Sequence, residues 1–171
     1  MFIPISVNIS AKHFQQDYLI SMVKKALNES GLAPEYLKLE ITESVFIRNP
    51  EHVAEVIHRL KGMGVQISID DFGKGYSSLY QLLYLPIDEI KIDRQFIRDI
   101  HQNDKQALLV KSILELARGL QLNVVAEGVE TKLENEVLLQ MGCYEIQGFL
   151  FSPPLAKEDI IKLLQAERNS I

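Results

Sequence analysis

The sequence predicts an α/β fold of the TIM-like (β/α) barrel type, with about six of the eight strands that close such a barrel. Two patterns predict this fold. Short apolar segments alternate with amphipathic helical segments along the whole chain, and nearly every apolar segment ends in a polar side chain. Alternation of this kind builds parallel sheets. An open doubly wound sheet would concentrate its ligand residues at one switch point, whereas a barrel uses all its strand ends, so we favour the barrel.

The expected elements follow one another as strand-and-helix units. Strands are expected at 5–9, 37–41, 65–69, 89–92, 122–126 and 145–146. Helices are expected near 19–30, 50–61, 78–84, 105–118, 132–141 and 158–165. Gly31 is typical of a residue that closes a helix, and Pro50 suits the first turn of the next one. No linker or low-complexity segment divides the sequence, so we expect one domain over residues 1–171.

Composition and charge exclude several classes of protein. The net charge is −5 and the pI is about 5.4, so the overall positive field that attracts DNA or RNA is missing. Cys143 is the single cysteine, which excludes an intramolecular disulfide and a Cys-rich zinc site and fits a reducing, cytoplasmic setting. No apolar stretch approaches the ~20 residues of a membrane span, and the opening residues lack the basic start of a secretion signal.

Polar side chains gather where the expected strands end, and a barrel would bring them to one mouth. These residues are Asn8, Glu40, Thr42, Glu43, Asp70, Asp71, Lys91, Asp93, Glu127, Glu130 and Gln147. Crowded carboxylates are costly unless cations neutralise them, and oxygen ligands select hard ions such as Mg²⁺ or Mn²⁺. Adjacent Asp70 and Asp71 suit two ions, because one carboxylate can bridge ions ~3.5–4 Å apart for in-line phosphoryl chemistry. The pattern predicts a two-metal site.

Each of these residues also has a plainer interpretation. A single carboxylate at a strand end is often a loop residue or a helix cap. The Gly-rich segment that follows Asp71 is a tight turn that Ser77 or Ser78 would cap. Lys91 would pack its stem and extend its head to solvent. Beside several carboxylates, however, we expect Lys91 to hold a water molecule or a phosphate.

Motifs along essentially the whole chain resemble those of one family. They are Val7-Asn8-Ile9-Ser10, Leu39-Glu40-Ile41-Thr42-Glu43-Ser44, the run from Asp70-Asp71-Phe72-Gly73-Lys74-Gly75 to Leu79, Leu85-Pro86, Lys91-Ile92-Asp93-Arg94, Ala126-Glu127-Gly128-Val129-Glu130-Thr131 and Gln147-Gly148-Phe149. In this order they resemble the motifs of the EAL family, bacterial cyclic di-GMP phosphodiesterases that are named for a Glu-Ala-Leu tripeptide.

The resemblance implies a barrel that binds two Mg²⁺ or Mn²⁺ ions, is inhibited by Ca²⁺, and hydrolyses cyclic di-GMP to linear pGpG. By motif, Asn8, Glu40 and Asp70 would hold one ion, and Asp70, Asp71 and Glu127 the other. Lys91, with Glu127, would be catalytic and would position the attacking water. Support would come from Glu43, which would anchor the loop after Asp71, and from Asp93, Glu130 and Gln147. The resemblance also implies a homodimer and a sensor or cyclase domain in a longer protein.

The chain departs from the family pattern in two places. The Glu-Ala-Leu segment is absent, so the family's first two strands, with a metal-ligand glutamate and an arginine, would lie before Met1. Lys74 stands where a small or hydroxyl residue is expected. Two alternative functions therefore stay open. One is a receptor that binds cyclic di-GMP without cutting it, and the other is an interaction module that dimerises through an open sheet edge or the Leu82–Leu85 segment.

Overall fold

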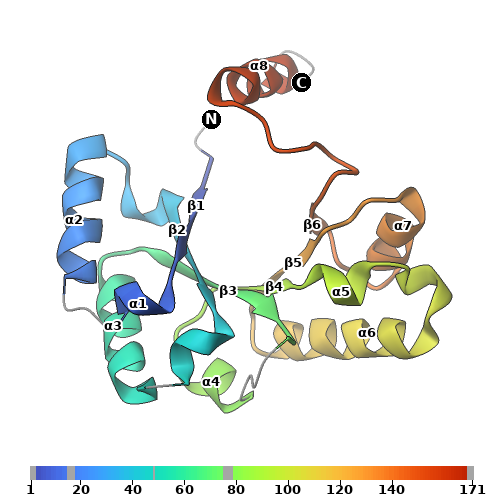
Figure 1. Ribbon diagram of the computed structural model, residues 1–171, viewed down its shortest axis with the longest axis horizontal. Coiled ribbons are helices and arrows are strands. Elements are labelled where there is room, and N and C mark those ends of the chain that lie inside the picture. The colour runs from blue at the N-terminus through green and yellow to red at the C-terminus, as the bar shows by residue number, and fades with distance from the viewer. Residues whose placement is uncertain (1–2, 15–17, 48, 75–78, 169–171) are drawn as a thin grey trace.

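The computed structural model describes residues 3–14, 18–47, 49–74 and 79–168, and it shows one curled parallel sheet with helices around its outer side (Figure 1). The strands are β1 (Ile5–Ile9), β2 (Leu37–Thr42), β3 (Gln66–Phe72), β4 (Glu89–Ile92), β5 (Asn123–Glu127) and β6 (Glu145–Gln147). They lie side by side in chain order, and every pair is parallel. The expected TIM-like fold with six strands is confirmed: within the described residues, β1 and β6 are the two edges of a half-barrel.

Helices follow the strands, as the sequence predicts. The longer ones are α2 (Leu19–Ser30), α3 (Pro50–Gly62), α4 (Leu79–Tyr84), α6 (Asp104–Gly119), α7 (Lys132–Gln140) and α8 (Lys157–Arg168). Gly31 ends α2 with a left-handed φ of 68°, and Pro50 opens α3 behind an Asn49 cap. The cap expected from Ser77 or Ser78 lies outside the described residues.

Five short helices were not expected from the sequence. They are α1 (Ala11–Phe14), α5 (Arg94–Ile97), η1 (Pro34–Tyr36), η2 (Glu43–Phe46) and η3 (Ile100–Gln102). Each is about one turn long, so it cannot show the periodic apolar face that identifies a helix in a sequence. Two of them matter for function, because η2 and α5 begin directly after β2 and β4.

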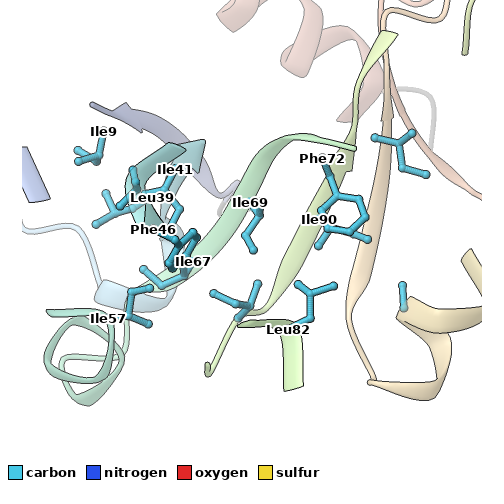
Figure 2. Close-up of a cluster of buried hydrophobic side chains, with 14 of the residues drawn as sticks. Ile9, Leu39, Ile41, Phe46, Ile57, Ile67, Ile69, Phe72, Leu82 and Ile90 are labelled. Carbon is cyan, nitrogen blue, oxygen red and sulfur yellow. The ribbon is translucent and has the colours of Figure 1, made fainter. Parts of the chain in front are cut away.

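The main core lies between the outer face of the sheet and the helices. Figure 2 shows part of it, where Leu39, Ile41, Ile67 and Ile69 point from β2 and β3 towards side chains such as Ile57 of α3. Successive strand residues point to opposite faces, so Lys38, Glu40 and Ser68 point to the concave side. That side is polar: Lys38 pairs with Glu89, which is almost fully buried.

The two edge strands expose apolar side chains. Ile5 and Val7 of β1 are 53% and 41% exposed, and Phe149 and Phe151 beyond β6 are 66% and 69% exposed. Cys143 is buried and free. Among the described residues, no helix has the length and apolar character needed to cross a bilayer.

Candidate metal centre

The end of β3 turns two neighbouring carboxylates to the same side. Ile69 and Phe72 are both buried in the core, yet they are three residues apart, and the register with β4 shifts between them. This is a bulge, which re-aims side chains. Asp71 has a φ of 56°, a left-handed conformation that Asp tolerates better than most residues. Asp70 and Asp71 can therefore both face the concave side of the sheet.

A cluster of carboxylates results. Asp70, Asp71 and Glu127 each offer an oxygen atom, and these atoms lie within 4.8 Å of one another. All three residues are half-buried. Since β3 and β5 flank β4, both strands deliver their carboxyl ends to the same place. An all-oxygen donor set suits a hard divalent cation.

Lys91 lies at the centre of this cluster. Its Nζ atom is 2.6 Å from Glu127 Oε1, 3.1 Å from Glu40 Oε2 and 3.6 Å from Asp70 Oδ1. The side chain is almost fully buried, and burial alone would lower the pKa of its ammonium group. The hydrogen bond to Glu127 and the charges of the carboxylates outweigh burial, and they hold the pKa of Lys91 above its ordinary value of 10.5. Lys91 is therefore a permanent cation.

One ammonium group does not neutralise the whole cluster. Burial raises the pKa of Glu127, and the negative charges of Asp70 and Glu40 raise it further, against the opposing effect of Lys91. Four carboxylates, those of Glu40, Asp70, Asp71 and Glu127, therefore share the one buried ammonium group of Lys91, which leaves an excess of negative charge. A divalent cation would remove this excess, so the donor atoms and the electrostatics both fit the expected metal.

Three other predicted residues lie on the edge strands of the sheet or in the loop after β5. Asn8 is exposed on the edge strand β1, opposite Glu40 in register. Gln147 is exposed on β6, opposite Glu127 in register. Glu130 is exposed too, and its carboxylate lies 3.9 Å from Arg94. These three lie beside the cluster, and its centre is built from Glu40, Asp70, Asp71, Lys91 and Glu127.

Two buried carboxylates hold the loops next to the centre. Glu43, at the start of η2, accepts a hydrogen bond of 2.8 Å from the Gly73 N–H. Gly73 has a φ of +98°, and an added Cβ would lie 2.6 Å from the ring of Phe96, so only glycine fits this turn. Asp93 caps α5 by accepting a 2.8 Å hydrogen bond from the Gln95 N–H.

Sequence reasoning missed two residues that shape the site. Lys74, which the sequence marks only as a departure from the family pattern, lies 2.8 Å from Asp71 Oδ1 and 2.6 Å from Asp93 Oδ2. Glu134 is buried and accepts hydrogen bonds from the backbone N–H groups of residues 99, 130 and 131. The Thr131-x-x-Glu134 spacing of a capping box was a visible signal for Glu134. Lys74 had no such signal, because Asp93 follows another strand.

Comparisons with known proteins agree with this architecture. Residues 2–154 match the EAL domain family. The bifunctional diguanylate cyclase/cyclic di-GMP phosphodiesterase MucR of Pseudomonas aeruginosa is 44% identical over 157 residues, which are 92% of this chain and 23% of MucR. The chain spans about a quarter or less of the length of such curated relatives.

Solved structures give the same result. A MucR phosphodiesterase complex with c-di-GMP superimposes with a TM-score of 0.87 at 44% identity, covering 92% of this chain and 64% of that one. The EAL domain of Mycobacterium smegmatis DcpA gives 0.92 at 38% identity, covering 96% and 74%. A manganese and cyclic di-GMP complex of Klebsiella pneumoniae BlrP1 gives 0.83 at 34% identity, covering 88% and 39%. Because the family match spans most of the chain and the fold agrees throughout, this chain belongs to the EAL domain family.

Proposed function

We propose that this chain carries the metal-binding part of an EAL phosphodiesterase domain, which hydrolyses cyclic di-GMP to linear pGpG. The observation that carries the proposal is the set of oxygen atoms from Asp70, Asp71 and Glu127 within 4.8 Å of one another, next to buried Lys91. Such a set is costly unless cations occupy it. The names of MucR and NbdA, both cyclic di-GMP phosphodiesterases, support the choice of substrate.

Two Mg²⁺ or Mn²⁺ ions are the proposed cofactors. Asp70, Asp71 and Glu127 would hold one ion. Asn8, Glu40 and Asp70 would hold the other. When bound, the ions would lower the pKa of the attacking water and offset the charge of the phosphodiester. The manganese and calcium complexes of BlrP1 with cyclic di-GMP support a metal requirement in the family.

The chain's own residues then orient the reaction. Water adds to one phosphorus atom, and the ester bond from phosphorus to the 3′ oxygen breaks. That oxygen takes a proton, which leaves a linear dinucleotide with a 5′ phosphate. The protonated Lys91, held by Glu127, would donate hydrogen bonds to the attacking water and to the phosphate oxygens as negative charge develops there. Glu43 would keep the loop after Asp71 in place, and Asp93, Glu130 and Gln147 would support the site from its rim.

Product analysis tests the proposal. The chain is incubated with cyclic di-GMP and Mn²⁺ or Mg²⁺, and the nucleotides are separated by chromatography. We expect pGpG from the wild type, a loss of at least about a hundredfold in Asp70→Asn and Asp71→Asn, and little change in Asp104→Asn, an exposed control on α6. Equal activity in Asp70→Asn would reject the assigned site. Replacing Mn²⁺ with Ca²⁺ is expected to allow binding and prevent hydrolysis.

A receptor is the second candidate, and one observation favours it. Asn8 is exposed on an edge strand, so one of the two ligand sets is open on one side. Calorimetry with cyclic di-GMP and Ca²⁺, followed by product analysis with Mn²⁺, separates the two functions. Heat of binding without pGpG supports the receptor, whereas the absence of heat excludes it.

The remaining expectations concern assembly and location. We infer a homodimer, and exposed Leu83 and Tyr84 on α4 offer an apolar contact, although Leu82 is buried in the core. Light scattering tests this, and a monomer at all concentrations would contradict it. The greater length of the curated relatives supports an attached sensor or cyclase domain. A cyclic di-GMP substrate implies a cytoplasmic location, which fractionation of the native protein would test.

A further inference from the structure

Lys74 places a second ammonium group beside the metal centre. Its Nζ atom lies 2.8 Å from Asp71 Oδ1 and 2.6 Å from Asp93 Oδ2. The two carboxylates differ in burial: the side chain of Asp93 is 4% exposed, whereas that of Asp71 is 40% exposed. Asp93 is also fixed as the cap of α5. The lysine is therefore anchored at Asp93, and its ammonium group extends from there to Asp71.

Asp71 consequently has two possible cationic partners. One of its oxygen atoms belongs to the group formed with Asp70 and Glu127, and Oδ1 accepts the hydrogen bond of Lys74. A carboxylate can accept more than two partners, so contact with both cations is geometrically possible. A divalent ion a few ångströms from an ammonium group is repelled by it, however, and the ammonium group already compensates part of the charge that attracts the ion.

Lys74 differs from Lys91 in a way that allows movement. Lys91 is 6% exposed in its side chain and touches carboxylates on three strands, whereas Lys74 is 44% exposed and pairs only with Asp71 and Asp93 among the described residues. Lys74 and Asp93 also line a polar hollow of about 690 Å³ together with Arg94, Gln95 and Arg98. The ammonium group of Lys74 can thus move away from Asp71 into this hollow while it stays paired with Asp93.

We propose that Lys74 is a built-in competitor for the cation at Asp71. In the metal-free protein its ammonium group pairs with Asp71 and holds the loop after β3 in place. An ion that binds Asp71 repels this ammonium group and favours its displacement towards Asp93, so Lys74 weakens metal binding at that position. This inference rests on the metal site of the proposed function, and it concerns the strength of that site.

Metal binding by variants of Lys74 is the direct test. Removing the charge in Lys74→Ser or Lys74→Gln is expected to tighten Mn²⁺ binding about two- to fivefold, the effect expected for a half-exposed ion pair. Lys74→Arg keeps the charge, so its affinity is expected to stay within about twofold of the wild type. Lys162→Ser is the matched control, because Lys162 pairs with Asp159 at the same spacing and distance, far from β3 in the sequence.

Free Mn²⁺ is titrated by electron paramagnetic resonance, and the rise in Tm on adding Mn²⁺ is a second readout. The rise is expected to be larger for Lys74→Gln than for the wild type. Equal affinities and equal rises in all four variants and the wild type would overturn the role of Lys74 and leave the metal site standing. A wild type that binds no Mn²⁺ would instead contradict the metal site itself, and with it the proposed role of Lys74.

Discussion

The Glu43 carboxylate reaches from the start of η2 to the end of β3, where it accepts a 2.8 Å hydrogen bond from the Gly73 N–H. Glu43 is 8% exposed and Gly73 is exposed, so this is a partly buried, charge-assisted hydrogen bond between two neighbouring loops. It connects the segment after β2 with the turn that follows Asp71. The position of Asp71 in the metal centre therefore depends on a residue that does not touch the other carboxylates of the cluster.

Removing this contact is expected to destabilise the protein. Glu43→Ala removes the carboxylate that accepts the hydrogen bond of the Gly73 N–H, which should lower the free energy of unfolding by about 0.5–1.5 kcal/mol. Glu43→Gln keeps a carbonyl acceptor, so its loss should be smaller. Urea unfolding measures both, with Glu35→Ala as the control, because Glu35 is an exposed residue of η1. If Glu43→Ala were as stable as that control, the contact would have no structural importance.

Lys91 is expected to matter for stability as well as for chemistry. Lys91→Met leaves Glu40, Asp70 and Glu127 without the cation that they share, and breaking a buried ion pair in this way costs about 3–5 kcal/mol. Urea unfolding in metal-free buffer at neutral pH is the measurement. Lys162→Met, which removes an exposed lysine, should cost less than about 1 kcal/mol. An equal cost in the two variants would show that the cluster does not depend on Lys91.

The strands and the longer helices could be predicted because their apolar residues repeat with a clear period. Leu39 and Ile41 alternate with Lys38 and Glu40, and the structure buries the first pair among the helices and turns the second to the concave side. The short helices could not be predicted in this way. α5 is held by its Asp93 cap, and its four residues cannot show a helical period.

The sequence predicts which strand ends contribute residues to the site. It predicts less well how their side chains are oriented there. That Asp70 and Glu127 meet follows from parallel topology alone. The participation of adjacent Asp71 requires the bulge and its φ of 56°, neither of which has a signal in the residue pattern. The pairing of Lys74 with Asp93 joins segments after different strands. The metal-ligand roles themselves stay predictions.

The loops after β5 and β6 pack closely against each other at Gly148. A Cβ on Gly148 would lie 2.1 Å from the carbonyl oxygen of Val129, which is backbone and cannot rotate away. Gly148→Ala should therefore force these loops apart and cost about 1–3 kcal/mol. Gly119→Ala is the matched control, because nothing lies within 4 Å of its added Cβ at the end of α6. Thermal unfolding of both checks this, and a Tm of Gly148→Ala at or above that of the control would contradict the close approach.

Glu134 should make stability depend on pH. Burial alone would raise the pKa of this carboxyl, but hydrogen bonds from the backbone N–H groups of Glu130, Asp99 and Thr131 lower it below its ordinary value of 4.5. A carboxyl with a lowered pKa stabilises the fold above its unfolded pKa, and this contribution is lost as the pH falls through the lowered value. The free energy of unfolding of the wild type should therefore exceed that of Glu134→Gln by about 1.5–3 kcal/mol at neutral pH.

Below pH 4.5 that difference should shrink, because the unfolded carboxyl binds a proton first, and it should be lost once the pH falls through the lowered pKa of the folded carboxyl. Urea unfolding of both proteins at neutral pH and at several acidic pH values measures the change. Glu136→Gln on the exposed side of α7 alters the net charge equally and controls for general charge effects. A difference that stays constant down to the acid limit would mean that packing of Glu134, rather than its charge, holds the loop before α7, since neutral and charged carboxyls fill the same space.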